Sequence, residues 1–361
     1  PIGNYVLRID STQVKDRAGN AMGADFLDTH FTIKQFSVEW IADSGGNWNT
    51  AANWSTGVVP TAIDDVFIGV TSSPVTISTG AVTVQSLISN ANFTLSGGTL
   101  TLNGDSQINA SFTFSGGTLT GPGVLTLTGA GNQWTGGTIT GAGTTQFNAD
   151  LAITGANSKT ISGNRVVDFS GTTSWSGNTG VNNNQILFGG GTINNTGTWN
   201  DTNAFDTLFN NFGGTNAFNN SGTYNKQGNT LTTIPIAYNN TATANVNAGT
   251  LRLTGGGTDT GSFNIGAGTT LDLNSGTHHL NNITTAGAGT FQISGSTGFN
   301  FVNVNGGTYP TLLLISGGNL QGTGATFTGP VTWTGGTITG LGSFTFDNTL
   351  AITGSTTKTL S

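Results

Sequence analysis

Short stretches of alternating apolar and polar residues, separated by glycine, run through most of the chain. In residues 325–339, apolar residues and threonines alternate on both sides of a Gly-Pro break. A period of two places the threonines on one face and four apolar residues on the other, namely Phe327, Val331, Trp333 and Ile338. The pattern predicts short β-strands with one apolar face, joined at glycine-rich corners.

The same pattern recurs about every 20 residues. Ser-Gly-Gly-Thr-Leu begins at Ser96 and again at Ser115, and Thr-Gly-Gly-Thr-Ile begins at Thr135. Short strands at this period are typical of a solenoid whose coils stack on one another. We therefore predict an all-β fold, a right-handed parallel β-helix (β-solenoid) with ~20-residue rungs, since parallel crossovers are right-handed. A β-sandwich or a propeller array is the alternative, and the short period disfavours both.

A longer repeat encloses these rungs. Residues 333–361 align with residues 134–162 without a gap, and 18 of the 29 aligned positions are identical. The rungs are therefore nested in a unit of 199 residues. We expect residues 71–361 to be β-helix repeats with a truncated second copy, cut from a longer parent chain. At ~20 residues per rung they give roughly 15 rungs and a rod roughly 70 Å long.

Residues 1–35 have a different pattern. Residues 5–9 and 31–33 alternate like two strands, and Asp-Arg-Ala-Gly-Asn at 16–20 reads as part of the turn between them. This segment resembles the last strands of a bacterial immunoglobulin-like domain, of the type strung in tandem in large surface proteins. The resemblance implies that residues 1–35 are the C-terminal part of such a β-sandwich, whose front half lies outside this chain.

Residues 36–70 contain three tryptophans, Trp40, Trp48 and Trp54, followed by Val-Pro and Asp-Asp-Val. Their order resembles the opening segment of many autotransporter-like and repeat-rich bacterial surface β-helices. Large aromatic residues near the start of a solenoid can cover the open end of its core. We predict that residues 36–70 form a Trp-rich linker or N-terminal cap of the solenoid.

Charge narrows the function classes. Only 7% of the residues are charged and the net charge is −7, so nucleic acid and anionic lipid are not expected partners. No apolar run approaches the ~20 residues of a membrane span, so no membrane insertion is expected in this segment. The chain has no cysteine, which excludes disulfides, thiolate metal sites and cysteine nucleophiles. A bacterial extracellular or cell-surface location is the best fit, with the targeting sequence elsewhere.

The candidate metal ligands are Asp16, Asp64 and Asp65. Asp64 and Asp65 are the one adjacent acidic pair, which could bind calcium or serve in acid–base catalysis, but a polar turn before a strand is the favoured interpretation. Asp16 could ligate calcium at a domain junction, and a turn role is again favoured. His278 and His279 are adjacent on a predicted strand and should point to opposite faces. No other cofactor is expected.

Catalysis has little support in the sequence. Glycosidase chemistry needs two carboxylates at a defined separation, and the remaining aspartates are scattered. We expect no enzyme activity and assign no catalytic residue.

Thr-x-Thr pairs carry a separate hypothesis. A flat threonine array on a β-solenoid resembles ice-binding proteins. The alternative is that threonine is simply a good uncharged residue for the outside of a strand. We favour the alternative, because uneven rung lengths between residues 163 and 305 should interrupt a flat array. The pairs are Thr99/Thr101, Thr118/Thr120, Thr126/Thr128, Thr138/Thr140 and Thr337/Thr339.

These observations favour a structural or adhesive segment of a large secreted or cell-surface bacterial repeat protein. Its partners would be a host or neighbouring cell surface, glycans, or copies of itself in a fibre. A carbohydrate-binding or carbohydrate-cleaving β-helix and an ice-binding solenoid are the alternatives.

Overall fold

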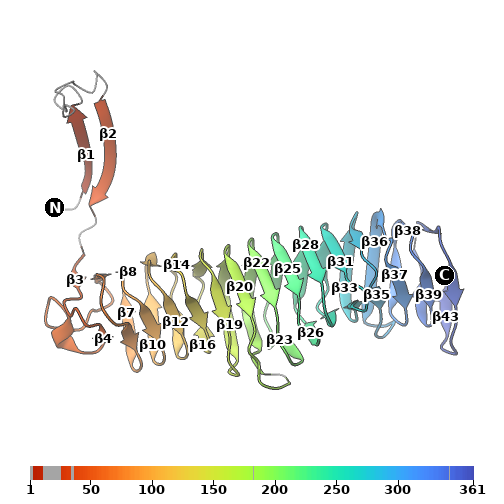
Figure 1. Cartoon of the computed structure of the whole chain (residues 1–361), viewed down its shortest axis with the longest axis horizontal. Coiled ribbons are helices and arrows are strands. Elements are labelled where there is room, and N and C mark those ends of the chain that lie inside the picture. Colours follow the sequence, from red (N-terminus) through yellow and green to blue (C-terminus); the bar gives the residue numbers. More distant parts are fainter. Residues whose placement is uncertain (1–2, 11–25, 34–35, 182, 341) are drawn as a thin grey trace.

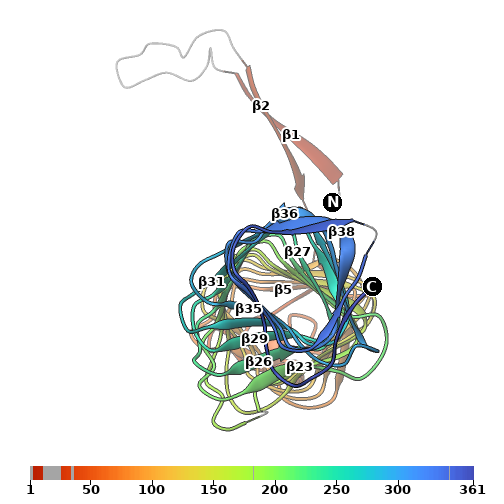
Figure 2. The same ribbon diagram turned by 90° about the vertical axis from the view of Figure 1, so that its right-hand side faces the viewer.

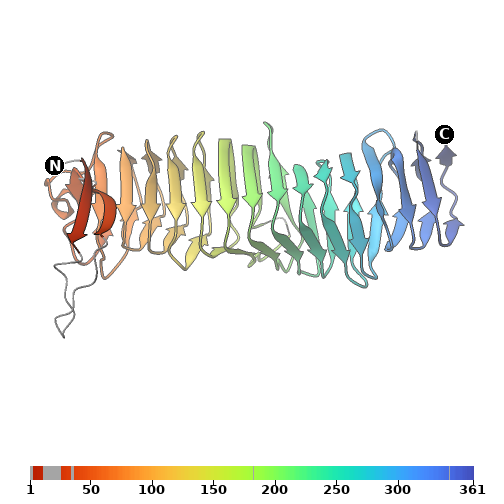
Figure 3. The same ribbon diagram turned by 90° about the horizontal axis from the view of Figure 1, so that it is seen from above.

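The computed structural model describes residues 3–10, 26–33, 36–181, 183–340 and 342–361. From residue 36 onward, short strands stack along one axis into an elongated rod (Figures 1 and 3). Seen along that axis, the chain winds around a closed ring of strands (Figure 2). The described residues form a parallel β-solenoid of about 15 turns, so the predicted all-β solenoid with ~20-residue rungs is confirmed.

Each turn contributes a strand to three parallel faces. The first face stacks β7 (Ala81–Val84), β10 (Thr99–Leu102), β13 (Thr118–Thr120), β16 (Gly137–Ile139), the starts of β19 (Lys159–Phe169) and β21 (Ile186–Asn195), β23 (Thr207–Asn211), β26 (Leu231–Ile234), β29 (Thr250–Leu253), β32 (Thr270–Leu273), β35 (Thr290–Ile293), β37 (Leu312–Ile315), β39 (Val331–Trp333) and β42 (Leu350–Ile352).

The second face is formed in two stretches. It stacks β3 (Val38–Glu39), β5 (Asp65–Ile68), β8 (Ser86–Ser89), β11 (Ser106–Ile108), β14 (Val124–Leu127), β17 (Thr144–Phe147), the ends of β19 and β21, β24 (Ala217–Asn220) and β27 (Ala237–Asn240). It continues with β30 (Gly257–Asp259), β33 (Gly276–Asn281), the starts of β36 (Asn300–Thr308) and β38 (Asn319–Phe327), β40 (Gly336–Ile338) and β43 (Lys358–Leu360).

The third face stacks β4 (Gly46–Asn47), β6 (Val75–Ile77), β9 (Phe93–Leu95), β12 (Phe112–Phe114), β15 (Asn132–Trp134), β18 (Leu151–Ile153), β20 (Thr172–Trp175), β22 (Thr198–Asp201), β25 (Thr223–Lys226), β28 (Thr243–Val246), β31 (Ser262–Ile265), β34 (Thr284–Ala286), the ends of β36 and β38, and β41 (Ser343–Phe346).

Alternation along each strand separates the core from the surface. In β10, Leu100 and Leu102 are buried while Thr99 and Thr101 are half-exposed. The four apolar residues Phe327, Val331, Trp333 and Ile338 are all buried, as predicted, but they belong to β38, β39 and β40 and so point into the core from three faces. Inward rings also stack from turn to turn, as Phe147 and Phe169 do with centroids 5.4 Å apart. Each turn therefore buries its apolar residues against the turns on either side.

Glycine is required where consecutive corners approach closely. Gly98 has φ 67°, and a Cβ there would lie 2.3 Å from the carbonyl oxygen of Gly80 in the preceding turn. Gly117, one turn later, has φ 79°, and its Cβ would lie 2.6 Å from the Gly98 oxygen. Any other residue would be strained and would separate the turns, which explains the repeated Gly-Gly-Thr.

Third-face strands on either side of a long rung stay in register. The extra residues between β20 and β21 lie in a loop, while Thr172 still pairs with Thr198 and Thr198 with Thr223 on the third face. On the first and second faces, β19 and β21 shift register between Ser162 and Arg165. The pairing does not test whether the faces are flat, so the expectation of an interrupted flat array stays a prediction.

The N-terminal segment contains two described strands, β1 (Gly3–Asp10) and β2 (Phe26–Ile33), which pair antiparallel from Gly3↔Ile33 to Asp10↔Phe26. The two strands predicted for residues 1–35 are therefore present. An immunoglobulin-like sandwich is not shown, and that assignment stays a prediction. Asp16 lies outside the described residues.

Tryptophans lie at the N-terminal end of the solenoid. After β3 and β4, the chain passes through the short 3-10 helix η1 (Ala51–Asn53), and Trp54 forms an antiparallel bridge with Trp40. The ring of Trp54 packs edge-on against Trp48 at 4.6 Å and against Trp40 at 4.8 Å. Trp48 in turn contacts Phe93 inside the solenoid at 5.9 Å. The three rings are buried at this end of the solenoid, and their role as a cap stays a prediction.

Candidate functional site

Asp64 is built into a turn. Its Oδ2 accepts hydrogen bonds from the backbone N–H (2.7 Å) and the hydroxyl (2.8 Å) of Thr61, and its Oδ1 accepts one from the Ser37 hydroxyl. Partial burial is the largest single influence and raises the pKa of Asp64, but the hydrogen bonds from Thr61 and Ser37 together outweigh it and lower the pKa below its usual value. Asp65 accepts a hydrogen bond from Ser86 in the next turn. The Asp64 carboxylate thus holds the turn before β5, whereas the carboxylate of Asp65, the first residue of β5, joins this turn to the next one.

The structure does not assemble the metal candidates into a ligand set. Among the described residues, no three or more His, Asp or Glu side chains lie close enough to hold an ion together. His278 is buried and His279 is exposed, so the two histidines point to opposite faces as predicted. Nε2 of His278 lies 2.9 Å from the Ser275 carbonyl oxygen, and burial lowers the pKa of this histidine to about 4.

Several scattered aspartates join consecutive turns. Asp105 accepts a hydrogen bond from the backbone N–H of Val124 at 3.1 Å. Asp150 does the same for Thr172 at 2.8 Å, and Asp206 for Leu231 at 2.9 Å. In each case the carboxylate satisfies a donor of the following rung. This repeated structural role accounts for the spacing of these residues along the chain.

Buried polar groups lie inside the solenoid, where the sequence analysis did not place them. The carboxylate of Asp201 is fully buried and accepts hydrogen bonds from Thr232 (2.5 Å), Tyr224 (3.3 Å) and Asn203 (3.0 Å). The Lys226 side chain is also buried, and its Nζ donates to the carbonyl oxygen of Gly228. Burial lowers the pKa of Lys226, and the negative charge of Asp201 opposes that shift.

Asp259 is a second interior carboxyl. Its Oδ1 accepts the backbone N–H of Asn240 at 2.9 Å, while its Oδ2 has no hydrogen-bond partner in the described structure. Burial raises the pKa of Asp259 to about 7. The hydroxyl of the buried Tyr238 also has no partner there. This part of the interior therefore favours a protonated, neutral carboxyl.

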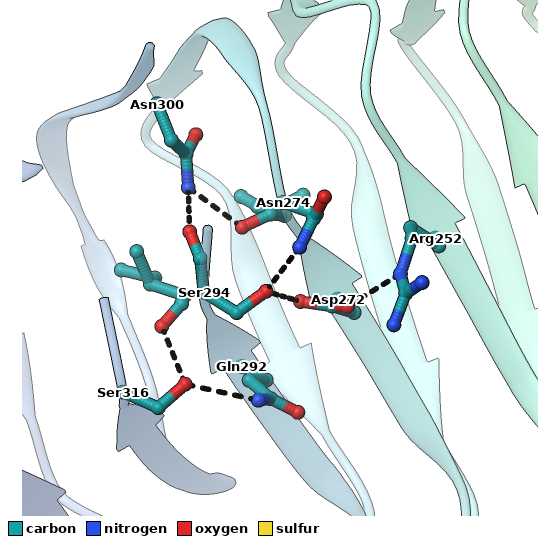
Figure 4. A network of polar contacts seen from close by, with 9 residues as sticks. Arg252, Asp272, Asn274, Gln292, Ser294, Asn300 and Ser316 are labelled. Atoms are coloured by element: carbon teal, nitrogen blue, oxygen red, sulfur yellow. Dashed lines mark hydrogen bonds and ion pairs between the residues drawn. The ribbon is translucent and has the colours of Figure 1, made fainter. Parts of the chain in front are cut away.

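Asp272 anchors a polar network near the first face (Figure 4). It accepts hydrogen bonds from Arg252 Nε at 2.8 Å and from the Ser294 hydroxyl at 2.6 Å. Asn274 donates to Ser294 Oγ at 2.8 Å, and Asn300 donates to the Ser294 carbonyl oxygen at 2.7 Å. The network spans three turns, and every contact serves to join strands or corners.

Asparagine side chains form columns along the rod. On the second face, Asn219 donates to Asn194 Oδ1 and Asn239 donates to Asn219 Oδ1, each at 2.8 Å. On the third face, the same contact at 2.8 Å joins Asn200, Asn225, Asn245 and Asn264 in order. Stacked amides of this kind hold neighbouring strands in register.

A parallel column runs inside the wall. Asn195 donates to Asn220 Oδ1 at 2.7 Å, and Asn220 donates to Asn240 Oδ1 at 2.8 Å. These three residues follow Asn194, Asn219 and Asn239 in the sequence, yet their amides donate in the opposite direction along the rod. The two columns therefore oppose each other's dipoles.

Three of the five threonine pairs come together on the first face. Thr99 lies beside Thr118 and Thr101 beside Thr120, and Thr118 lies beside Thr138. The remaining two pairs have other neighbours. Thr126 lies between Gln107 and Gln146, and Thr337 lies beside Asn319. Thr83 lies beside Thr101 and Thr160 beside Thr138, so the in-register threonines extend over five consecutive turns, from β7 to β19.

One groove near the C-terminal end has a volume of about 600 Å³. Its lining residues are uncharged, and they include Asn303, Asn305, Gln321 and Thr339. No Asp or Glu side chain is among its lining residues.

Comparison of the chain with protein-family models, with curated proteins and with solved structures gives no match. The described part of the chain contains no helix that is long and apolar enough to cross a membrane. Any proposal for the function therefore rests on the sequence and the solenoid structure.

Proposed function

We propose that this chain is a structural or adhesive segment of a large secreted or cell-surface bacterial repeat protein, working as a stalk, a fibre or a matrix component. The observation that carries the proposal is that polar side chains form hydrogen bonds between consecutive turns. The asparagine columns and the aspartates at the corners join one turn to the next along the rod. Such an arrangement suits a stiff spacer.

Two features of the sequence support the location. The low charge and the threonine-, asparagine- and glycine-rich surface suit an extracellular repeat protein. The resemblance of residues 1–35 to the end of an immunoglobulin-like domain fits a chain of tandem surface modules. We propose that such a domain precedes the solenoid.

The proposal is tested by displaying the chain on bacteria between a membrane anchor and a small binding module. A Gly/Ser linker of equal length is the control, because it behaves as a flexible coil. We expect the solenoid to hold the module at a single distance of roughly 70 Å from the surface, whereas the flexible linker should give a broad spread of distances, as measured by time-resolved fluorescence energy transfer to a membrane dye. A spread for the solenoid as broad as that for the linker would contradict the proposal.

Ice binding is a second candidate, favoured by the in-register threonine array on the first face. If the array binds ice, Thr118→Lys should abolish thermal hysteresis because it places a charge at the array's centre. Thr126→Lys, on the second face between Gln107 and Gln146, is the control and should have no effect. No hysteresis in the unsubstituted protein at high concentration would remove this candidate.

A further inference from the structure

Lys159 and Asn184 meet inside the wall of the solenoid. Both side chains are fully buried, and Nζ of Lys159 lies 2.5 Å from Oδ1 of Asn184. The residues belong to consecutive turns, because β19 begins at Lys159 and pairs there with Ile186 of β21. The contact therefore joins the start of β19 to the loop between β20 and β21 in the next turn.

The carboxamide of Asn184 is held in one orientation. Its Nδ2 donates to the Ser176 carbonyl oxygen at 2.7 Å and to Asn203 Oδ1 at 3.1 Å. Its backbone has φ 58°, and its carbonyl oxygen accepts the indole N–H of Trp175 at 2.9 Å. The amide carbon is thus presented beside the lysine nitrogen, one bond from the oxygen that Nζ contacts.

The lysine has no counter-ion. The ion pair between Arg252 and Asp272 is the one found in the described residues, and no carboxylate pairs with Lys159. Carbonyl oxygens of Thr154 (2.6 Å) and Asn157 (2.8 Å) accept from its Nζ, but they carry no charge. Burial lowers the pKa of Lys159 to about 8, which increases the fraction of nucleophilic amine. An unpaired buried ammonium is unfavourable, and converting it to an amide would remove the charge.

We propose that Lys159 and Asn184 form an intramolecular isopeptide bond. Nζ of Lys159 attacks Cγ of Asn184, a new C–N bond forms, and the Cγ–Nδ2 bond breaks. The lysine ammonium and the carboxamide give a secondary amide and one ammonium ion, so atoms and charge balance without an oxidant or reductant.

A buried carboxylate lies next to the leaving nitrogen's hydrogen-bond partner. Asn203 accepts from Nδ2 of Asn184, and its own Nδ2 donates to Asp201 Oδ1 at 3.0 Å. The negative charge of Asp201 therefore favours the positive charge that develops on the departing nitrogen. Asp201 acts as a positioning and electrostatic residue, not as a group that touches the reacting atoms.

The second copy of the long repeat supplies a matched control. Lys358 occupies the position of Lys159, and its Nζ donates to the carbonyl oxygens of Gly354 (3.0 Å) and Thr356 (2.9 Å). In the described chain no asparagine side chain reaches this lysine. The same turn is thus present without the reaction partner, and Lys358 should keep a free amine.

Mass spectrometry of the purified, folded chain tests the proposal. We expect an intact mass lower than the sequence mass by one ammonia, and a proteolytic fragment in which the peptides containing Lys159 and Asn184 are linked. Lys159→Met and Asn184→Ala should each restore the full mass, while Lys358→Met should retain the loss.

The unsubstituted protein decides the question even if a variant fails to fold. An intact mass equal to the sequence mass would overturn the proposal. A loss of ammonia without linked peptides would also overturn it, because a succinimide at an asparagine gives the same loss. Linked peptides that persist in Asn184→Ala would assign the bond to another residue and overturn it as well.

Discussion

Two nearly identical segments of the chain lie in different surroundings. Residues 134–162 and 333–361 share 18 of 29 positions and fold into the same strands. Leu151 and Ile153 of β18 are 2% and 0% exposed, whereas their counterparts in β42, Leu350 and Ile352, are 38% and 59% exposed. β18 is covered by β20 in the next turn, and β42 has no described strand beyond it.

This difference separates what a rung owes to its own sequence from what it owes to the neighbouring turn. Local sequence is enough to make the strand and its corner, since both copies have them. Burial of the inward side chains depends on the neighbouring turn. We therefore expect the same substitution to change the free energy of unfolding by different amounts in the two copies.

The largest contrast is expected for Ile153→Ala and Ile352→Ala. Ile153 is enclosed between turns, and its truncation should lower the free energy of unfolding by about 4 kcal/mol through lost burial and a cavity. The exposed Ile352 should cost no more than about 0.5 kcal/mol. Urea unfolding followed by tryptophan fluorescence measures both. Similar losses in the free energy of unfolding for the two variants would contradict a dependence of burial on the neighbouring turn.

The pH dependence of interior groups should show the next largest effect. Burial raises the pKa of Asp259 to about 7, so between about pH 4 and 7 the unfolded chain loses a proton that the folded chain keeps, and the free energy of unfolding falls as pH rises. Burial lowers the pKa of His278 to about 4, so from about pH 6.5 down to 4 the unfolded chain gains a proton first, and the free energy of unfolding falls as pH drops.

These opposite slopes should largely cancel in the unsubstituted protein. Asp259→Asn should reveal the histidine and lose about 3 kcal/mol between pH 6.5 and 4. His278→Gln should reveal the aspartate and gain about as much on the same acidification. Parallel profiles for the two variants, measured by urea unfolding at each pH, would show that neither group is buried as described.

Lys159→Met and Lys358→Met compare the stability of the two copies again, with a smaller expected difference. Removing Lys159 leaves buried carbonyl oxygens without their donor and also removes the proposed isopeptide bond, so the free energy of unfolding should fall by at least about 2 kcal/mol. Lys358 makes contacts of the same kind in an exposed turn, where water can replace it, so its loss should cost under about 0.5 kcal/mol. Thermal unfolding by circular dichroism would record the difference, and equal shifts in Tm would argue against it.

The smallest effect is expected for an asparagine column. Asn219→Ala removes two contacts, one with Asn194 and one with Asn239, and should cost about 1 kcal/mol. Asn219→Gln, which keeps an amide but changes its reach, should recover only part of it. A gain in stability for Asn219→Ala would show that the column does not join the turns.

Much of the fold could be predicted from the sequence because the governing signals are local. Period-two alternation placed Phe327 and Trp333 inside, and the Gly-Gly-Thr spacing gave the rung length. Asp64 could be read as a turn residue from its place before an apolar strand, whereas Asp65 already belongs to that strand.

The interior polar groups were missed because a polar residue in such a strand is first read as outward. The alternation along each strand nevertheless indicated that these residues point inward. Asp201 lies two residues from the inward Trp199, Lys226 two from Tyr224, and His278 two from Leu280. Asn184 carried no such signal. It lies in a loop, and its contact with Lys159 depends on how two turns stack.

Hydrogen exchange in the two copies tests the central claim most directly. We expect slow exchange for the amides of β18 and the start of β19, and fast exchange for those of β42 and β43. Attaching a second copy of residues 163–195 after Ser361 should slow exchange in β42 and β43 toward the values of the first copy. Equal exchange in both copies before the extension, or no slowing after it, would contradict the claim that the neighbouring turn stabilises each rung.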